Sequence, residues 1–338
     1  MPVNDKIRVP DYNDIRNKLN NVMGTGSGNS GYGQTTLGPS VSESSRVTIN
    51  EYGALRYDII NAWKHIYGSN PTLVVPAEGN TVRYDTDFAP SSNMALEAPN
   101  TQYNTYADNI IANRFTVHAS QSATQALTPV SSTWPGIYGT QWTSRIQCTV
   151  TATWTSAAAA RYFFNSGGQI RFSSSRSGGS STTQNTSWNT ILSGAGTRSF
   201  GGNIPSAGVS PNDGNNYFRC TNAQQAWSAV FGSSPYGTNN WRISARTPSV
   251  ANNSSGTAAS VEFLVEWIDN YVDPGIAAMP PSTPIQTATP ATFPPDDSVD
   301  GTFTLNVSYL YATGVLEPPG TGNFTVEQPT ITISAIAP

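Results

Sequence analysis

Few residues in this 338-residue chain could carry chemistry, and they are widely separated. The chain has two histidines, His65 and His118, so a catalytic triad or a histidine metal site would have to use one of them. His65 comes near the end of an expected helix, where the helix dipole favours a cationic side chain. His118 takes a polar position in an expected strand. Neither position indicates a general base.

Glu262 and Glu266 are four residues apart in one expected strand. At about 3.3 Å per residue their Cα atoms would be about 13 Å apart. The two carboxylates of a glycosidase lie about 5 to 10 Å apart, which is shorter. We therefore expect both glutamates on the polar, exposed face of a strand, and we predict no catalytic residue.

The segment from Gly26 to Gly31 matches the pattern GxGxxG. A dinucleotide-binding loop of that pattern needs a strand before it and a helix opening at its last glycine. Here an expected helix precedes it and Tyr32-Gly33-Gln34 follows, so we expect a flexible linker. The sequence has no P-loop, HExxH, CxxC or DxDxDG motif, and we predict no cofactor and no metal site.

Two aromatic-rich loops could stack on sugars. Trp134, Tyr138 and Trp142 cluster in one of them, and Tyr236 and Trp241 lie in the other. The competing interpretation is that these rings plug the ends of a β-sandwich, and we favour it. Trp134, Trp142 and Trp241 stay the candidate glycan contacts.

The composition suggests a subunit of an assembly. Charged residues make up 11% of the chain, against about a quarter in an average soluble domain, so Ser, Thr, Asn and Gln must cover the surface. The net charge of −4 argues against nucleic acid as a partner. Cys148 and Cys220 are too few for a disulfide framework; we expect buried free thiols, although the sequence leaves their pairing open. Without a signal peptide or a long apolar run, we expect a soluble chain made in the cytoplasm with no membrane partner.

The first seventy residues predict two amphipathic helices. Asp11 can cap the first, which ends at Gly24, and Thr48 and Glu51 have capping-box spacing for the second, which ends at Gly68. Their apolar stripes should dock on each other and then on the β-rich body or on a neighbouring subunit. The candidate assembly interface consists of Ile15, Leu19, Val22, Leu55, Ile59 and Trp63.

The rest of the chain predicts an antiparallel β-structure. Tyr162-Phe163-Phe164, the turn Asn165–Gly168 and the arm Gln169–Ser173 suggest a hairpin, followed by a short helix that carries Trp188. Period-two alternation recurs in five further runs that begin at Phe115, Ile146, Trp241, Val261 and Phe303. We therefore predict an α+β, mainly β chain: an N-terminal helical pair followed by an antiparallel, jelly-roll-like β-sandwich body with Pro-rich arms.

The expected divisions follow shifts in composition along the chain. Residues 1–70 form a helical docking module with a Gly-rich loop, and residues 71–112 form an extended connector. Residues 113–275 form the sandwich, and 276–300 a Pro-rich linker or arm. Residues 301–338 supply C-terminal strands, which complete either this body or a neighbour's sheet.

Five stretches carry a resemblance to a known family: VMGTGSGNSGYGQ, YGALRYDIINAWKHIYG, RYFFNSGGQIRFSSSRSGGSSTTQNTSWNTIL, SVEFLVEWIDNYVDPG and GVLEPPGTGNFTVEQP. As a set, the chain resembles virion structural proteins of contractile-tailed phages of marine cyanobacteria. The resemblance implies a non-enzymatic component of the tail, neck or fibre apparatus, located in the virion and partnered by other virion proteins. Together with the low charge, it suggests a homo-oligomer.

Two other functions stay open from the sequence. A carbohydrate-binding receptor module at a fibre tip would use Trp134, Trp142 and Trp241 on a host surface glycan. A glycan-degrading tail enzyme would need two carboxylates brought close together from different strands.

Overall fold

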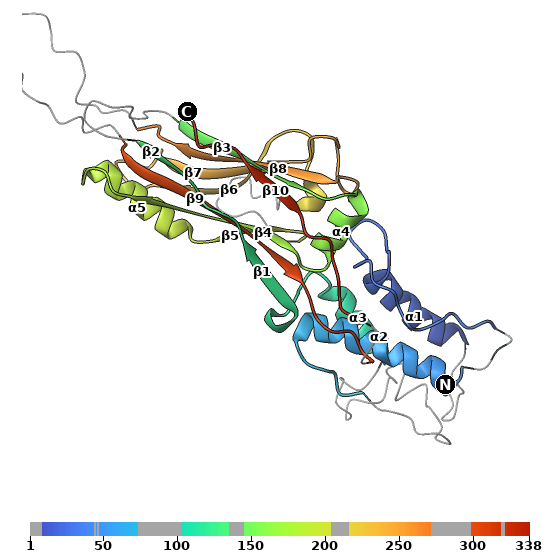
Figure 1. Cartoon of the computed structure of the whole chain (residues 1–338). Helices are drawn as coiled ribbons and strands as arrows, with labels where there is room; N and C mark the ends of the chain where they lie inside the picture. Colours follow the sequence, from blue (N-terminus) through green and yellow to red (C-terminus); the bar gives the residue numbers. More distant parts are fainter. Residues whose placement is uncertain are drawn as a thin grey trace, which may run out of the picture.

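Figure 1 shows a computed structural model of the chain, in which a helical module lies at one end of a β-sandwich. The structure describes residues 9–43, 45, 47–73, 103–134, 145–203, 216–271, 299–318 and 322–338. The α-helices of this part of the chain are α1 (Val9–Met23), α2 (Ile49–Tyr67), α3 (Tyr103–Ala112), α4 (Ala157–Asn165) and α5 (Thr183–Ala195). Its strands are β1 (Ser122–Ala126), β2 (Val130–Trp134), β3 (Arg145–Thr153), β4 (Gln169–Ser177), β5 (Arg198–Gly201), β6 (Gln225–Phe231), β7 (Asn240–Arg246), β8 (Ser260–Ile268), β9 (Gly301–Ala312) and β10 (Thr330–Ile333).

The strands form two antiparallel sheets, which confirms the predicted mainly β, α+β sandwich. The first sheet has the order β1-β9-β4-β5, with β2 also paired to β9, and the second has the order β10-β3-β8-β7-β6. The sheets pack face to face: the Phe172 and Phe263 ring centroids are 4.9 Å apart, and Trp267 Nε1 donates to Ser174 Oγ at 3.0 Å. Helix α5 packs against β4, β6 and β7, with the Trp188 ring against Phe303.

Period-two alternation places one side of each long strand in the core. Strand β3 buries Ile146, Cys148, Val150 and Ala152, and β9 alternates in the same way over twelve residues. Such alternation is the local signature of a strand with one buried face, and these strands confirm the prediction. The run at Phe115 is different, because residues 113–118 form no strand.

The two predicted N-terminal helices are confirmed. Helix α2 begins with the expected capping box: Thr48 N donates to Glu51 Oε2 at 2.6 Å, and Thr48 Oγ1 accepts from Glu51 N. It ends at Gly68, whose left-handed conformation (φ 79°) and backbone bond to Lys64 O close the last turn. Asp11 lies in the first turn of α1 and not at its cap position.

Helix α3 corrects the expected extended connector. Residues 103–112 form a helix that packs on both α1 and α2, so the module has three helices among the described residues. Tyr103 and Tyr106 bury their rings there, and Lys18 Nζ donates to Asn104 Oδ1 and to Asp108 Oδ1. Of the remainder of that connector, residues 74–102 lie outside the described part.

Helix α4 corrects the predicted hairpin. Tyr162, Phe163 and Phe164 lie in this helix and not in a strand, whereas the second arm is confirmed as β4. The local reason is the sequence Ser-Ala-Ala-Ala-Ala that precedes them: Ser156 Oγ caps the helix by accepting from Ala159 N at 3.1 Å, and alanine has the highest helix propensity.

Several chain segments fasten the helical module to the sandwich. His65 Nε2 donates to the Ser166 carbonyl at 3.0 Å, and Asn165 Nδ2 donates to the Gly31 carbonyl at 3.1 Å. The loop after α1 packs so closely on α4 that a Cβ at Gly33 would lie 2.4 Å from the Tyr162 ring, which explains the glycine there. This loop was expected to be a flexible linker, but its backbone is a contact surface between the two modules.

The C-terminal strands complete the chain's own sheets. Strand β9 lies between β4 and the pair β1 and β2, while β10 pairs with β3 from Thr330↔Thr153 to Ile333↔Val150. Between them, Phe324 stacks on His65 within the helical module, with ring centroids 4.5 Å apart. Of the two alternatives left open by the sequence, the structure shows pairing within one chain.

Candidate functional site

Five of the six predicted assembly residues lie inside the molecule. Ile15, Leu19, Val22, Leu55 and Ile59 are all buried in one apolar cluster with α3 and Phe324. Trp63 is half-buried, and its ring lies 4.7 Å from that of Tyr106 and 4.0 Å from that of Tyr67. The stripes are therefore covered by helix–helix packing and by the C-terminal segment, and they do not form an open docking surface.

Two of the three predicted glycan contacts, Trp134 and Trp241, are in the wrong place for stacking on a sugar. Trp134 and Trp241 are buried and belong to the core of the sandwich. Trp142 lies outside the described residues. An indole must be exposed to stack on a sugar ring. Trp134 and Trp241 therefore fit the competing interpretation, in which these rings fill the interior of the sandwich.

The two glutamates of β8 are ion-paired and not poised for acid–base chemistry. Glu262 Oε1 accepts from Arg246 Nε at 2.6 Å, while Glu266 accepts from Arg145 on one oxygen and from Arg242 on the other. Glu266 is buried, which corrects the expectation of an exposed position. Both carboxylates are therefore neutralised by arginines of neighbouring strands.

Cys148 and Cys220 are buried free thiols, and burial raises the pKa of each to about 12. Across the described ranges, no group of three or more His, Cys, Asp or Glu side chains could hold a metal ion. No helix within those ranges is long and apolar enough to cross a membrane.

His118 caps a short 3-10 helix (Ala119–Gln121): its Nδ1 accepts from Ser120 N at 3.1 Å. His65 is fully enclosed instead of being a cationic group at a helix end. Burial lowers the pKa of His65 to about 4, because desolvation of the imidazolium outweighs the bond to the Ser166 carbonyl.

Asp58, on the same helix, has a pKa that is shifted in the opposite direction to that of His65. Burial raises the pKa of Asp58 to about 6, although the Leu37 and Gly38 N–H groups both donate to its carboxylate at 2.8 Å. The folded-state pKa of His65 is depressed, so its stabilising contribution is lost as pH falls from 6.5 towards 4. The folded-state pKa of Asp58 is raised, so its contribution is lost as pH rises from 3.8 through 6.

We expect these opposing contributions to be separable by mutation. The wild type gains stability from Asp58 as the pH falls from 6.5 to 4, and Asp58→Asn lacks this gain. At pH 4 the free energy of unfolding of Asp58→Asn, compared with the wild type, should therefore be roughly 2 to 3 kcal/mol lower than the same comparison gives at pH 6.5, since a shift of one pKa unit corresponds to about 1.4 kcal/mol. His65→Gln, whose amide can still donate to Ser166, should show the opposite change in slope. Urea unfolding at pH 4, 5, 6 and 7 measures both, with His118→Gln as the control at an exposed imidazole. Parallel pH profiles for the two variants would contradict the assignment.

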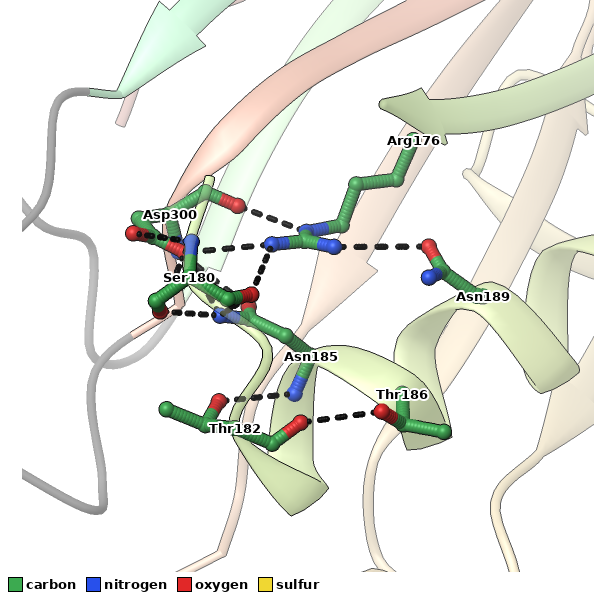
Figure 2. Close-up of polar contacts among 7 residues, drawn as sticks. All are labelled: Arg176, Ser180, Thr182, Asn185, Thr186, Asn189 and Asp300. Atoms are coloured by element: carbon green, nitrogen blue, oxygen red, sulfur yellow. Dashed lines mark hydrogen bonds and ion pairs between the residues drawn. The ribbon is translucent and has the colours of Figure 1, made fainter. Parts of the chain in front are cut away.

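The most elaborate polar cluster lies at the end of the sandwich opposite the helical module, which we call the distal end. Trp134 pairs with Gly301 there, and Arg145 pairs with Ile268. The cluster, which we call the clamp, consists of Arg176, Ser180, Asn185 and Asp300, and Figure 2 shows it. It joins the end of β4, the start of β9 and the first turn of α5.

Asp300 is the centre of the clamp. Its carboxylate accepts from Asn185 Nδ2 at 2.5 Å, from Ser180 N at 2.9 Å and from Ser180 Oγ at 3.0 Å (Figure 2). Arg176 Nη2 forms an ion pair with it at 3.1 Å, and the two side chains are only 3% and 5% exposed. Burial by itself would raise the pKa of Asp300, but the bonds from Ser180 and Asn185 and the Arg176 charge outweigh it and lower that pKa.

The local sequence explains the geometry of the clamp. Gly179 has φ 75°, and a Cβ there would lie 2.6 Å from Asp300 Oδ1, so only glycine lets the turn after β4 wrap around the carboxylate. Thr182 then caps α5 by accepting from Asn185 N at 3.2 Å. The Ser/Gly run therefore encodes the turn that surrounds Asp300.

Helix α5 holds the chain on both sides of the segment 272–298. Gln184 Nε2 donates to Asp269 Oδ2 at 2.7 Å, two residues before Tyr271, and the adjacent Asn185 binds Asp300. Consecutive residues of α5 therefore fix the chain where it leaves the described part and where it returns. Residues 276–298 of the predicted Pro-rich arm lie outside the described residues.

Searches of protein-family models, of curated proteins and of solved structures found no match to this chain.

Sequence reasoning missed the clamp because its partners are far apart in the chain. Arg176 and Asp300 are separated by 124 residues, and Asn185 and Asp300 by 115. One local signal exists: Thr182 is a favoured N-cap residue, which places the start of α5 at Thr183 and Asn185 in its first turn.

Proposed function

We propose that this chain is a non-enzymatic structural subunit of a virion, within the tail, neck or fibre apparatus of a contractile-tailed phage. The observation that carries the proposal is the separation of two different ends on one elongated body (Figure 1). The helical module forms one end. At the other, the ends of segments 135–144 and 272–298 are fixed by strand pairing and by the clamp. A subunit with unlike ends suits contacts with different neighbours along an axis.

The low charge supports the same proposal. Only 38 of 338 residues are charged. Hydroxyl pairs such as Ser131–Thr304 and Thr133–Thr302 line the outer face of the first sheet, and the two oxygens of each pair are 2.8 Å apart. A surface of short, mutually bonded hydroxyl side chains loses little side-chain entropy when another subunit covers it. Such a face suits burial in an assembly.

The test combines two measurements. Sedimentation velocity of the purified full chain should give the mass of a homo-oligomer, and electron microscopy of intact particles labelled with an antibody to the chain should show label along or around the tail. Label confined to fibre tips, with a monomeric chain, would favour receptor binding. Particles without label would overturn the proposal.

A further inference from the structure

The outer face of the second sheet carries two exposed side chains, Phe231 and Arg145, at the two ends of one aligned row at the distal end. Strand register places Phe231, Asn240, Ile268 and Arg145 opposite one another across β6, β7, β8 and β3. The neighbours Val230, Trp241, Trp267 and Ile146 pack into the core, so the side chains of this row lie on the opposite face. Phe231 and Arg145 are exposed there, whereas Ile268 is half-buried and Asn240 is buried.

The adjacent row carries charge. Arg242 on β7 and Glu266 on β8 are opposite each other, and Arg242 Nη2 lies 2.8 Å from Glu266 Oε2. Arg145 Nη1 lies 3.1 Å from the other oxygen of Glu266. Two arginines therefore neutralise one buried carboxylate, and the cluster keeps a net charge of +1 in a chain whose overall charge is −4.

Both guanidinium groups keep donors for a ligand. The side chains of Arg145 and Arg242 are 50% and 39% exposed. Among the described residues, no acceptor bonds to Arg145 Nε or Nη2, or to Arg242 Nη1. A guanidinium fork with unused N–H groups binds a carboxylate or a sulfate well, because both present two oxygens in its plane.

Phe231 supplies an apolar platform on the same face, one strand away from Arg242 and three strands away from Arg145. Its side chain is 56% exposed, the second-largest exposure of a large apolar side chain in the described residues. An exposed ring stacks on the apolar face of a sugar. An aromatic ring next to arginines is thus complementary to a ligand that is both carbohydrate and anionic.

We propose that Phe231, Arg242 and Arg145 bind an anionic polysaccharide that lies across the strands of the second sheet. Neighbouring strands are about 4.8 Å apart, which is close to the length of one pyranose unit, so successive sugars fall over successive strands. A sugar over β6 stacks on Phe231, and acidic groups on later units bind Arg242 and Arg145. The acidic group is a uronate carboxylate or a sulfate ester, which share the same recognition by arginine.

The test uses the full chain and single variants. Isothermal titration should detect binding of alginate-derived uronate oligosaccharides or heparin-derived sulfated oligosaccharides, and no binding of neutral dextran oligosaccharides. Arg145→Gln, Arg242→Gln and Phe231→Ser should each weaken that binding tenfold or more. Arg145 and Arg242 are changed singly, because removing both would leave Glu266 buried without a partner.

Arg246→Gln is the matched control. Arg246 is on the same strand and face as Arg242 and pairs with Glu262, but it lies four residues beyond Arg242 along β7. Arg246→Gln should leave the affinity for the oligosaccharide within about twofold of the wild type. A loss of affinity as large as that of Arg242→Gln would show that the ligand responds to net charge alone, and it would overturn the proposal. Absence of binding at millimolar concentration, or equal binding of dextran, would also overturn it. A preference for uronate or for sulfate identifies the source of the anion. None of these results bears on antibody labelling of particles, so the assembly proposal is tested separately.

Discussion

Replacing Asp300 with alanine is expected to lower the free energy of unfolding by about 3 to 5 kcal/mol, the cost of removing one partner of a buried ion pair. The variant leaves the Arg176 guanidinium almost fully buried without its counter-ion, and it removes the acceptor for Ser180 and Asn185. Because Asp300 also fixes the start of β9, the loss should include strand pairing at the distal end. Urea unfolding followed by tryptophan fluorescence measures the change.

The control for this prediction is Asp108→Ala. Asp108 forms an ion pair with Lys18 at 2.9 Å, but its side chain is exposed, so its loss should cost less than about 1 kcal/mol. Equal losses for the two variants would mean that the clamp contributes no more than a surface ion pair. Since folding lowers the pKa of Asp300, the stability that it contributes should disappear as pH falls below the ordinary range of an aspartate.

Trp241→Ala is expected to lower the free energy of unfolding by about 3 to 5 kcal/mol, the range for truncating a large buried aromatic side chain. The indole is buried between the sheets, so truncation leaves a cavity in the core. Trp241→Phe fills most of that space and should cost much less. Thermal unfolding monitored by near-ultraviolet circular dichroism checks both variants.

Phe231→Ala is the matched control for Trp241, because it truncates an aromatic side chain on the neighbouring strand that is largely exposed. It should change stability by less than about 0.5 kcal/mol. A Trp241→Ala variant that stays as stable as Phe231→Ala would contradict the core assignment and would return this residue to the candidates for glycan contact.

The elements that could be predicted from the sequence are those whose signal is local. The capping box at Thr48, the left-handed Gly68 and the alternation of β3, β8 and β9 each depend on residues within one turn or one strand. The aromatic run Tyr162–Phe164 suggests a strand, but the cap and the alanines before it form the stronger local signal, and the segment is helical.

The role of each residue could be predicted less well, because it depends on contacts between distant segments. The stripe on α2 was identified correctly, but α3 and Phe324 cover it, and no local pattern shows which segment will cover an apolar face. Glu266 was expected to be exposed because it alternates with buried residues, yet Arg145 and Arg242 reach over it from two other strands. Pairing of that kind becomes visible only when the strand order is known.

The clamp has a practical consequence for protein engineering. Consecutive residues of α5, Gln184 and Asn185, bind Asp269 and Asp300, so contacts within the sandwich hold the chain both before Tyr271 and after Val299. We therefore expect β8 and β9 to keep their positions when a fluorescent domain, an epitope or a shorter Gly-Ser connector replaces the intervening sequence. The distal end of the sandwich is thus a natural insertion point for display of foreign sequence.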